Sequence, residues 1–394
     1  MTAVALCAIG AEKAVSNEIR KLQLAIDEGG FGRIRFKTDL AGLYRALMGL
    51  RTADRVLLEA AWFPAYDFDM LFEGVRHQPW EEYIASGMGL KVSKVRTNRS
   101  KLKAETSIQA IVHKAAAERL CTKMGINRLP ENGDEAELRV YIEKDRVSVL
   151  LDLSGDPLFK RGYRTSGGIA PLRETTAAAI ILNSGWRRKF PLYDPFCGSG
   201  AIAIEAALYA WDIAPGIGRH FALDKLLIGN RETARNVRNE LLEKVDFTRL
   251  VRIGGSDSDA AIIAAARGNI ERAIAIARRS GSGGPSGQPL SFKVIPMSAA
   301  LPPPEFMETD GSAKAETEGF LITNPPYGRR LGDVESAEKT YSEMACLARN
   351  FPGWKLAVIT DHSGFESFFG KKADSCREIT NGAVRSYLYQ YEKL

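Results

Sequence analysis

The stretch F-P-L-Y-D-P-F-C-G-S-G-A-I-A-I-E-A-A-L-Y-A-W, residues 190–211, predicts the core of an α/β fold. Phe190 to Tyr193 is an apolar run typical of a strand, and Ala201 to Trp211 is an apolar helix. Between them, Gly198 and Gly200 let the backbone approach a ligand closely, next to the free N–H groups of a helix N-terminus. The spacing D-x-x-x-G-x-G, with no Lys-Ser or Lys-Thr after it, matches neither a P-loop nor the G-x-G-x-x-G motif. It predicts a ligand-binding turn at the carboxyl end of a strand.

A second turn of this kind follows the apolar run Gly319 to Ile322, which predicts another buried strand. In N-P-P-Y-G, residues 324–328, two prolines end that strand because proline cannot donate to a sheet ladder. The turn presents the Asn324 amide, the Pro325 carbonyl and the Tyr327 ring. An amine on a flat base could hydrogen-bond to the first two and stack on the third. The alternative interpretation is a plain polar loop, since Asn, Pro and Gly dominate turns.

Acidic residues follow a further predicted strand, Leu250 to Ser256. An acidic residue at this place in a strand–turn–helix unit can accept hydrogen bonds from ribose hydroxyls, and we assign this role to Asp257. The alternative is that Asp257 caps the helix expected over 260–277, although Asp259 could also fill that role. Additional predictions are strands at 292–295 and 355–360, a helix at 341–350, and a terminal hairpin over 376–380 and 383–391.

The amino-terminal part has a different pattern. Its first 50 residues predict a strand at 2–9, a helix at 12–24, a strand at 33–36 and a helix at 40–50, which is typical of a small α+β unit. Paired strands are expected at 138–141 and 147–153, around a turn at Lys144-Asp145. Residues 156–171 are rich in Gly, Pro and Arg and predict a link between domains.

A basic run occupies residues 91–123, where nine Lys and Arg residues face only Glu105 and Glu118. It begins in a loop-like stretch with interleaved Ser, Thr and Asn and continues into a helix predicted over 107–123. Such side chains bind phosphate oxygens without reading bases. The candidates for phosphate contact are Lys94, Arg99, Lys101 and Lys103, which become RNA-binding candidates if the phosphates are those of RNA. The alternative is an ordinary solvated helix face.

Composition sets the remaining limits. A chain of 394 residues is long enough for two or three domains, and its net charge of +6 is compatible with a nucleic-acid partner. Five cysteines form no C-x-x-C pair and four histidines show no ligand spacing, so we expect no metal. The amino terminus has no basic leader, and no apolar run reaches the roughly 18 residues of a membrane helix. We expect a cytoplasmic protein.

Several motifs together resemble one enzyme family. D-P-F-C-G-S-G (194–200) followed by N-P-P-Y (324–327) is similar to motifs I and IV of class I S-adenosylmethionine (SAM) methyltransferases that modify exocyclic amines. S-G-D-P-L-F-K-R-G-Y-R (154–164), A-P-L-R-E-T (170–175), G-S-D-S-D (255–259) and W-x-x-Y (80–83) resemble bacterial THUMP-domain RNA guanine-N2 methyltransferases. The resemblance covers nearly the whole chain.

The resemblance implies three domains: a ferredoxin-like unit over 1–55, a THUMP RNA-binding domain over 56–160 and a SAM-dependent methyltransferase domain over 165–394. The fold class is α/β, with a Rossmann-like seven-stranded catalytic sheet whose last strand is antiparallel and an α+β amino-terminal region. The implied activity is methyl transfer to a guanine N2 amine, with 23S ribosomal RNA as the partner. Alternatives are adenine-N6 methylation of DNA or RNA, a transfer-RNA substrate, and a non-catalytic RNA-binding assembly factor.

The resemblance also implies site residues. The SAM-binding set is Thr175, Asp194, Phe196, Gly198, Gly200, Asp257 and Asn324, and the catalytic set is Asn324, Pro325 and Tyr327. Arg161 and Arg164 join the RNA-binding candidates. Two departures stand out: Phe159 replaces the usual histidine, and no acidic residue follows the third strand, where Pro296-Met297-Ser298 stand.

Overall fold

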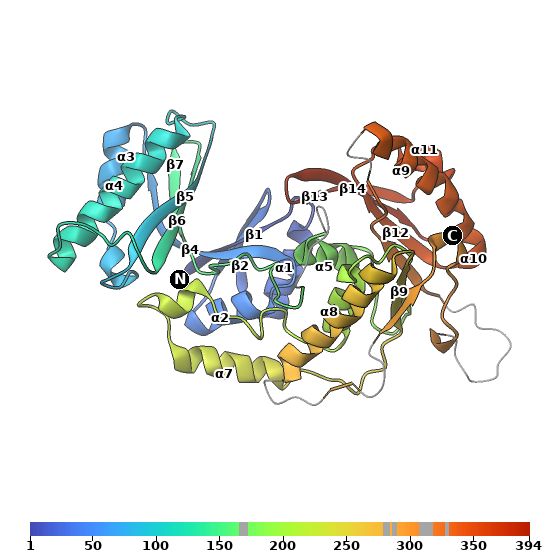
Figure 1. Ribbon diagram of the computed structural model, residues 1–394. Helices are drawn as coiled ribbons and strands as arrows, with labels where there is room; N and C mark the ends of the chain where they lie inside the picture. Colours follow the sequence, from blue (N-terminus) through green and yellow to red (C-terminus); the bar gives the residue numbers. More distant parts are fainter. Residues whose placement is uncertain (165–171, 279–283, 286–289, 307–317, 328–330) are drawn as a thin grey trace.

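The computed structural model describes residues 1–164, 172–278, 284–285, 290–306, 318–327 and 331–394. Two seven-stranded sheets dominate the described chain, the first at the left and centre of Figure 1 and the second at the right. The predicted α/β class is confirmed. Residues 165–171 of the predicted linker, and Gly328 after the second turn, lie outside the described residues.

The first sheet has the strand order β2-β3-β1-β4-β7-β6-β5. Its strands are β1 (Thr2–Cys7), β2 (Ala25–Gly30), β3 (Arg33–Lys37), β4 (Ala53–Pro64), β5 (Gly89–Asn98), β6 (Glu135–Glu143) and β7 (Arg146–Asp152), and its helices are α1 (Glu12–Lys21), α2 (Leu40–Gly49), α3 (Phe68–Arg76) and α4 (Glu105–Met124). The predicted amino-terminal unit is confirmed, with β2 in addition. The sequence A-I-D-E-G-G of β2 lacks apolar alternation because this edge strand is largely exposed, so its pattern gave no strand signal.

Strand β4 belongs to both predicted amino-terminal domains. Its first part pairs with β1, where Leu58 lies opposite Ala3, and its second part pairs with β7, where Pro64 lies opposite Arg146. The predicted boundary after residue 55 therefore falls inside a 12-residue strand. The division into a ferredoxin-like unit and a THUMP domain stays a prediction, and the two units share one continuous sheet.

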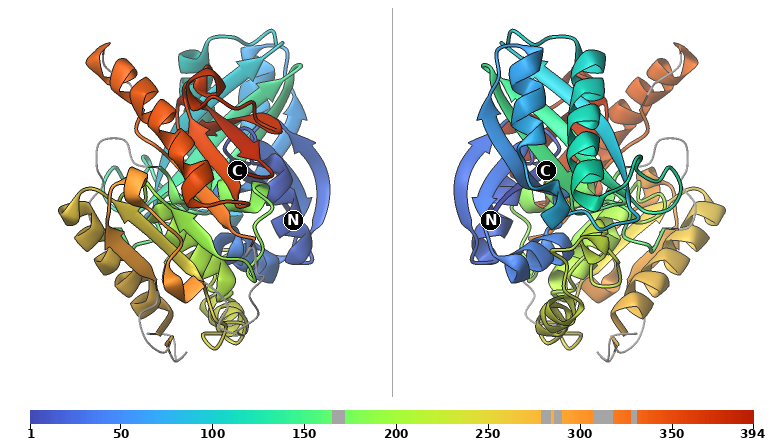
Figure 2. Two further views of the ribbon diagram at one scale, coloured as in Figure 1. Left: turned by 90° about the vertical axis from the view of Figure 1, so that its right-hand side faces the viewer. Right: turned by 90° about the vertical axis from the view of Figure 1, so that its left-hand side faces the viewer.

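The basic run does not form one surface. The sequence predicted a loop-like stretch for its first part, and this prediction is wrong. The first part is strand β5, which pairs in parallel with β6 and has a bulge between Val92 and Lys94. The bulge shifts the alternation of buried residues, which hid the strand in the sequence. Helix α4 is confirmed and lies beside α3 in front of the sheet in the right-hand view of Figure 2. The strand and helix parts of the run thus belong to different layers.

Helices α1 to α4 cover one face of the first sheet. Alternate strand residues such as Ala3, Leu58 and Val149 join these helices in the main hydrophobic core. Residues of the opposite parity, Val4, Leu57 and Leu150, form a separate small cluster on the other face. Because side chains of a strand alternate between faces, this second face is left without a helical layer in the described chain.

The second sheet has the strand order β10-β9-β8-β11-β12-β14-β13. Its strands are β8 (Leu192–Asp194), β9 (Ile253–Asp257), β10 (Ser291–Val294), β11 (Phe320–Thr323), β12 (Lys355–Thr360), β13 (Ser375–Asn381) and β14 (Val384–Tyr391). Strands β8 to β12 are parallel, and β14 is antiparallel to both β12 and β13. The predicted Rossmann-like sheet and its antiparallel last strand are confirmed.

Both faces of the second sheet are buried. In β11, Phe320 and Ile322 pack into one core and Leu321 into another, as expected for a continuously apolar parallel strand. The helices around this sheet are α5 (Glu174–Asn183), α6 (Ala201–Ala210), α8 (Ala260–Arg278), α9 (Leu331–Glu343), α10 (Leu347–Asn350) and α11 (Phe365–Phe369). Helix α7 (Arg231–Leu242) packs against α2 of the first half instead. Helix α9 begins at Leu331, ten residues before the predicted start at residue 341.

A buried ion pair joins the two halves. Arg161 Nε lies 3.4 Å from Glu205 Oε1 of α6, and these side chains are 2% and 0% exposed. The Arg161 guanidinium also donates to the carbonyl oxygen of Arg51, at 2.5 Å, in the amino-terminal half. Arg51 in turn donates to the carbonyl of Ile213, at 2.6 Å. Tyr163 Oη completes the cluster by donating to Glu205 Oε1 at 3.1 Å.

We expect Arg161→Ala to lower the free energy of unfolding by about 3–5 kcal/mol, because it leaves the Glu205 carboxylate buried without its partner. Urea unfolding followed by circular dichroism measures this change. Arg76→Ala is the matched control, since the Arg76 side chain is 48% exposed in its pairs with Glu73 and Glu118. The control should cost about 0–1 kcal/mol. Equal effects in the two variants would contradict a structural role for the buried pair.

Candidate active site

The candidate site lies at the carboxyl ends of β8, β9 and β11, which adjoin one another in the second sheet. Asp194 ends β8 and is 1% exposed. Its Oδ1 accepts hydrogen bonds from Thr323 Oγ1, at 2.6 Å, and from the Phe196 amide, at 3.1 Å. One carboxylate thus ties the end of β11 to the turn after β8, so the two predicted motifs meet in space.

Burial raises the pKa of the Asp194 carboxyl to about 7. The negative charge of Asp257 raises this pKa further, whereas the hydrogen bonds from Thr323 and the Phe196 amide lower it. A cation bound beside Asp194 would stabilise the charged carboxylate, because an opposite charge nearby favours the ionised form of a buried acid.

Asp257, at the end of β9, faces the glycine turn. Its Oδ2 accepts from the Gly198 amide at 3.2 Å, and its Oδ1 accepts from the Asp259 amide at 3.1 Å. The helix cap is Asp259 itself, whose Oδ1 accepts from the Ala261 amide at 2.7 Å. Asp259, and not Asp257, therefore caps helix α8. The ribose-binding role considered for Asp257 stays a prediction.

The two glycines of the first turn differ. Gly198 has φ +52°, and a Cβ placed there would meet no atom within 4 Å, so the turn borders open space at this point. Gly200 has φ +87°, and a Cβ there would lie 3.1 Å from the Phe292 ring and 3.2 Å from Ala266. Gly198 is suited to close ligand approach, and Gly200 allows α6 to pack against its neighbours.

The Asn-Pro-Pro-Tyr turn is held from two sides. The Tyr327 hydroxyl donates to Asn324 Oδ1, which has a second lone pair for another donor. The Pro326 carbonyl accepts from Tyr341 Oη of α9 at 3.2 Å, and this hydroxyl lies 2.9 Å from Thr360 Oγ1 at the end of β12. Tyr341 is fully buried. Its role was missed, because nothing in a helical tyrosine indicates which loop its hydroxyl reaches.

Three further predicted site residues make hydrogen bonds or ion pairs with other protein groups. Thr175 is buried, and its hydroxyl donates to Asp54 Oδ1 at 2.5 Å, so it contacts the amino-terminal half. Arg161 is buried in the cluster with Glu205, and the Arg164 guanidinium donates to the carbonyl of Leu172 at 3.2 Å. The prediction that these two arginines contact RNA is corrected, because their side chains are only 2% and 10% exposed and are paired with protein groups.

The other RNA-binding candidates are split between two places. Lys94 lies within β5 and lines a hollow on the uncovered face of the first sheet. Arg99, Lys101 and Lys103 lie beyond the end of that strand, where Lys101 Nζ is 5.0 Å from the centre of the Tyr66 ring. These four residues therefore do not form a single cluster.

Among the described residues, no group of three or more His, Cys, Asp or Glu side chains is arranged to hold a metal ion. None of the helices in this part of the chain is both long enough and apolar enough to span a bilayer.

Comparison with known families places this chain. The family model described as "RMKL-like, methyltransferase domain" matches residues 161–277 and 307–390. The chain belongs to this methyltransferase family. A second model, described as "RlmL ferredoxin-like domain", matches residues 2–57.

Relatives resemble the chain over nearly its full length. "Putative RNA methyltransferase YpsC" of Bacillus subtilis (strain 168) is 33% identical over 394 residues, covering 99% of this chain and 95% of that protein. "Ribosomal RNA large subunit methyltransferase K/L" of Syntrophotalea carbinolica is 32% identical over 97% of this chain. The chain spans about half the length of that relative, 52%. The solved structure of SMU.472 complexed with SAH is 34% identical, with a TM-score of 0.84 over 100% of this chain and 98% of that one.

The raised pKa of Asp194 predicts a pH effect on stability. Between its ordinary value of 3.8 and about 7, the folded state binds a proton that the unfolded state has released. Stability contributed by this group is therefore complete below pH 3.8 and is lost as the pH rises through about 7.

We expect the free energy of unfolding of the wild type to fall relative to Asp194→Asn when the pH is raised from about 5 to about 8, by up to about 3 kcal/mol. Urea unfolding at several pH values measures both curves, and the variant removes the titrating group with little change in shape. Parallel curves would show that Asp194 has an ordinary pKa.

Proposed function

We propose that this protein transfers a methyl group from SAM to the exocyclic N2 amine of a guanine in RNA, with 23S ribosomal RNA as the substrate. The observation that carries the proposal is the position of the Asn324 turn. Through Thr323 and Asp194 it adjoins the glycine turn and Asp257 at one edge of the sheet. The kinship with RNA methyltransferases supports the substrate class.

The residues at this edge fit SAM. The buried Asp194 carboxyl, with its pKa raised to about 7, suits the ammonium of the methionine end. Gly198 offers open space beside the chain, and the half-exposed Asp257 has the lone pairs to accept from ribose hydroxyls. When bound, SAM supplies a methyl group already activated on a sulfonium.

The protein's own task is to prepare a poor nucleophile. Guanine N2 is conjugated with its ring, so its lone pair is poorly available. Hydrogen bonds from the amine to Asn324 Oδ1 and the Pro325 carbonyl would favour a tetrahedral nitrogen and stabilise the charge that develops on it. Stacking on Tyr327 would hold a flipped base so that its amine points at the methyl group of SAM. Tyr341 acts through the loop as a positioning residue, because it fixes the Pro326 carbonyl.

The competing function is methylation of adenine N6. The Asn324 turn can accept hydrogen bonds from either exocyclic amine, so the turn alone does not distinguish guanine N2 from adenine N6. Incubating the purified protein with labelled SAM and either ribosomal RNA or duplex DNA, followed by nucleoside chromatography, separates the two. We expect label in N2-methylguanosine from RNA. Label in N6-methyladenine from either nucleic acid would overturn the proposal.

We expect Asn324→Ala to lower methyl transfer to RNA by ~10²–10³ while leaving SAM affinity within a few-fold, since it removes one acceptor that acts in the transition state. Single-turnover kinetics and calorimetry measure the two quantities. Asn127→Ala, at an exposed residue of the first half, is the control and should match the wild type. Near-normal turnover in Asn324→Ala would remove this residue from the catalytic set.

Tyr341→Phe tests the support of the turn. Loss of the hydroxyl frees the Pro326 carbonyl, and we expect kcat to fall about three- to tenfold with unchanged SAM affinity. Tyr391→Phe is the matched control, because Tyr391 of β14 is equally buried and its hydroxyl donates to the Lys371 carbonyl, at 3.0 Å, rather than to the turn. If both variants lose stability and kcat alike, the effect of Tyr341 is general rather than positional.

A further inference from the structure

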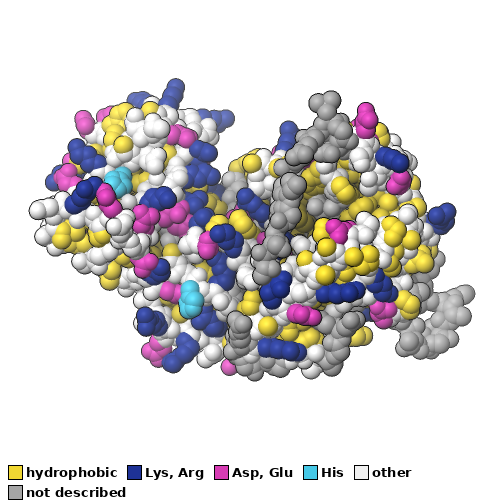
Figure 3. Space-filling view, in the orientation of Figure 1, with side chains coloured by type: hydrophobic (Ala, Val, Ile, Leu, Met, Phe, Trp, Pro, Cys, Tyr) yellow, Lys and Arg dark blue, Asp and Glu magenta, His cyan; other side chains and the backbone are white. Residues whose placement is uncertain are grey.

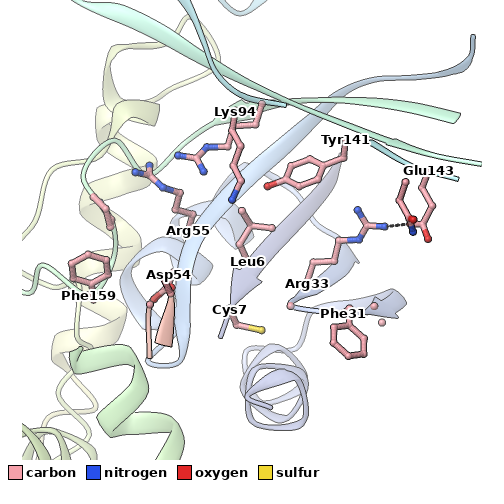
Figure 4. A pocket seen from close by; sticks show the side chains of 18 of the residues that line it. Leu6, Cys7, Phe31, Arg33, Asp54, Arg55, Lys94, Tyr141, Glu143 and Phe159 are labelled. Atoms are coloured by element: carbon pink, nitrogen blue, oxygen red, sulfur yellow. Dashed lines mark hydrogen bonds and ion pairs between the residues drawn. The ribbon is translucent and has the colours of Figure 1, made fainter. Parts of the chain in front are cut away.

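The uncovered face of the first sheet is hollowed. A cavity of about 1030 Å³ lies between this face, the β2–β3 turn and the second half of the molecule (Figure 4). That volume is at the upper end for small-molecule sites, which hold about 300–1,000 Å³. In Figure 3, Lys and Arg side chains gather along the inner edge of the left-hand lobe, where it faces the rest of the molecule.

Strand register explains this charge. Lys94 of β5 lies opposite Arg139 of β6, and Arg96 lies opposite Tyr141, so alternate positions project basic and aromatic side chains. Arg55 adds a further guanidinium from β4 and points into the same hollow in Figure 4.

Positive charge is in excess around Lys94. Arg55 and Arg139 share the buried Asp152 carboxylate, at 2.6 and 3.4 Å, and Arg139 also pairs with Glu137 at 2.7 Å. Among the described residues, no carboxylate lies within ion-pair distance of Lys94 Nζ. Burial lowers the pKa of Lys94, and the neighbouring charges of Arg96, Arg139 and Arg55 lower it further. A bound anion would relieve this repulsion.

Aromatic rings border the same hollow. Phe31, in the β2–β3 turn, is 85% exposed, although most large apolar side chains of this chain are buried. Phe159 lies at the opposite border, with the Arg173 guanidinium 4.6 Å from its ring centre. Exposed rings beside a basic groove are the arrangement with which proteins stack unpaired bases.

Part of the wall of the hollow comes from the second half of the molecule. Thr360 ends β12 at the catalytic edge and pairs with Tyr387 of β14. Because β14 is antiparallel, its preceding turn at Gly382-Ala383 projects beyond that edge, on the order of 10 Å along the strand direction. Gly382 and Ala383 line the hollow, so one wall of it is an extension of the catalytic edge.

We propose that this hollow holds a single-stranded segment of the RNA substrate, with a phosphate at Lys94 and a base stacked on Phe31. The inference rests on the proposed function and adds where the RNA lies outside the active site. It assigns RNA binding to the uncovered face of the first sheet instead of to the whole basic run over 91–123. The outer side of α4 is then not part of the RNA-binding surface.

The test compares Lys94→Gln/Phe31→Ala with a matched control, Lys123→Gln/Leu250→Ala. Lys123 is an exposed lysine on α4, the helix that covers the other face of the sheet, and Leu250 is an 83% exposed apolar residue of the second half. Fluorescence anisotropy of labelled oligouridylate, read from about 50 to about 200 mM KCl, gives the affinity and its salt slope. Polyglutamate serves as a competitor of equal charge.

We expect the Lys94/Phe31 variant to bind at least about tenfold more weakly, and its salt slope to fall by about 0.7. SAM affinity and melting temperature should stay unchanged, and the control variant should bind as the wild type does. Wild-type affinity in the Lys94/Phe31 variant would overturn the placement. Equal displacement by polyglutamate would instead indicate an acidic protein as the partner.

The assay also separates this inference from the proposed function. If the wild type methylates RNA but the Lys94/Phe31 variant binds it normally, the RNA lies elsewhere and only the hollow is excluded. If the wild type neither binds nor methylates RNA, the proposed function and the inference fail together.

Discussion

The buried ion pair between Arg161 and Glu205 is the constraint on which the rest of the structure depends. It joins the residues after β7 to α6 directly behind the glycine turn, and the Arg161 guanidinium also reaches the carbonyl of Arg51. Arg51 extends the same cluster to Ile213 in the second half. Charges in such a place are costly when they lose their partner, so a shift between the two halves that broke this pair would be unfavourable.

This docking gives the uncovered sheet face a fixed relation to the catalytic edge. The Asp54 carboxylate reinforces it, since it accepts from Thr175 at 2.5 Å and pairs with Arg173 at 3.3 Å. Thr175 was predicted to bind SAM and Arg161 to bind RNA, and in the structure both side chains make contacts between the two halves. A rigid connection suits an enzyme that must bring one nucleotide of a large RNA to a single loop, because geometry held in advance lowers the entropic cost of reaction.

Much of the second half could be predicted from the sequence, because its signals are local. The glycine turn, the Asn324 turn and the apolar strands each depend on a few neighbouring residues, and the structure brings their ends together. Strand β2 and the bulged β5 were missed because an exposed edge strand and a bulge erase the alternation on which prediction relies. The burial of Arg161 and the contact of Tyr341 with Pro326 depend on residues far away in the chain, and no local pattern encodes them.

Guanine N2 methylation of ribosomal RNA is tested most directly by mass spectrometry of nucleosides from the 23S RNA of a strain that lacks this gene. The structure and the kinship of the chain predict that one N2-methylguanosine disappears and returns when the wild-type gene, but not the Asn324→Ala variant, is restored. An unchanged content of N2-methylguanosine together with a loss of N6-methyladenosine would contradict guanine as the substrate.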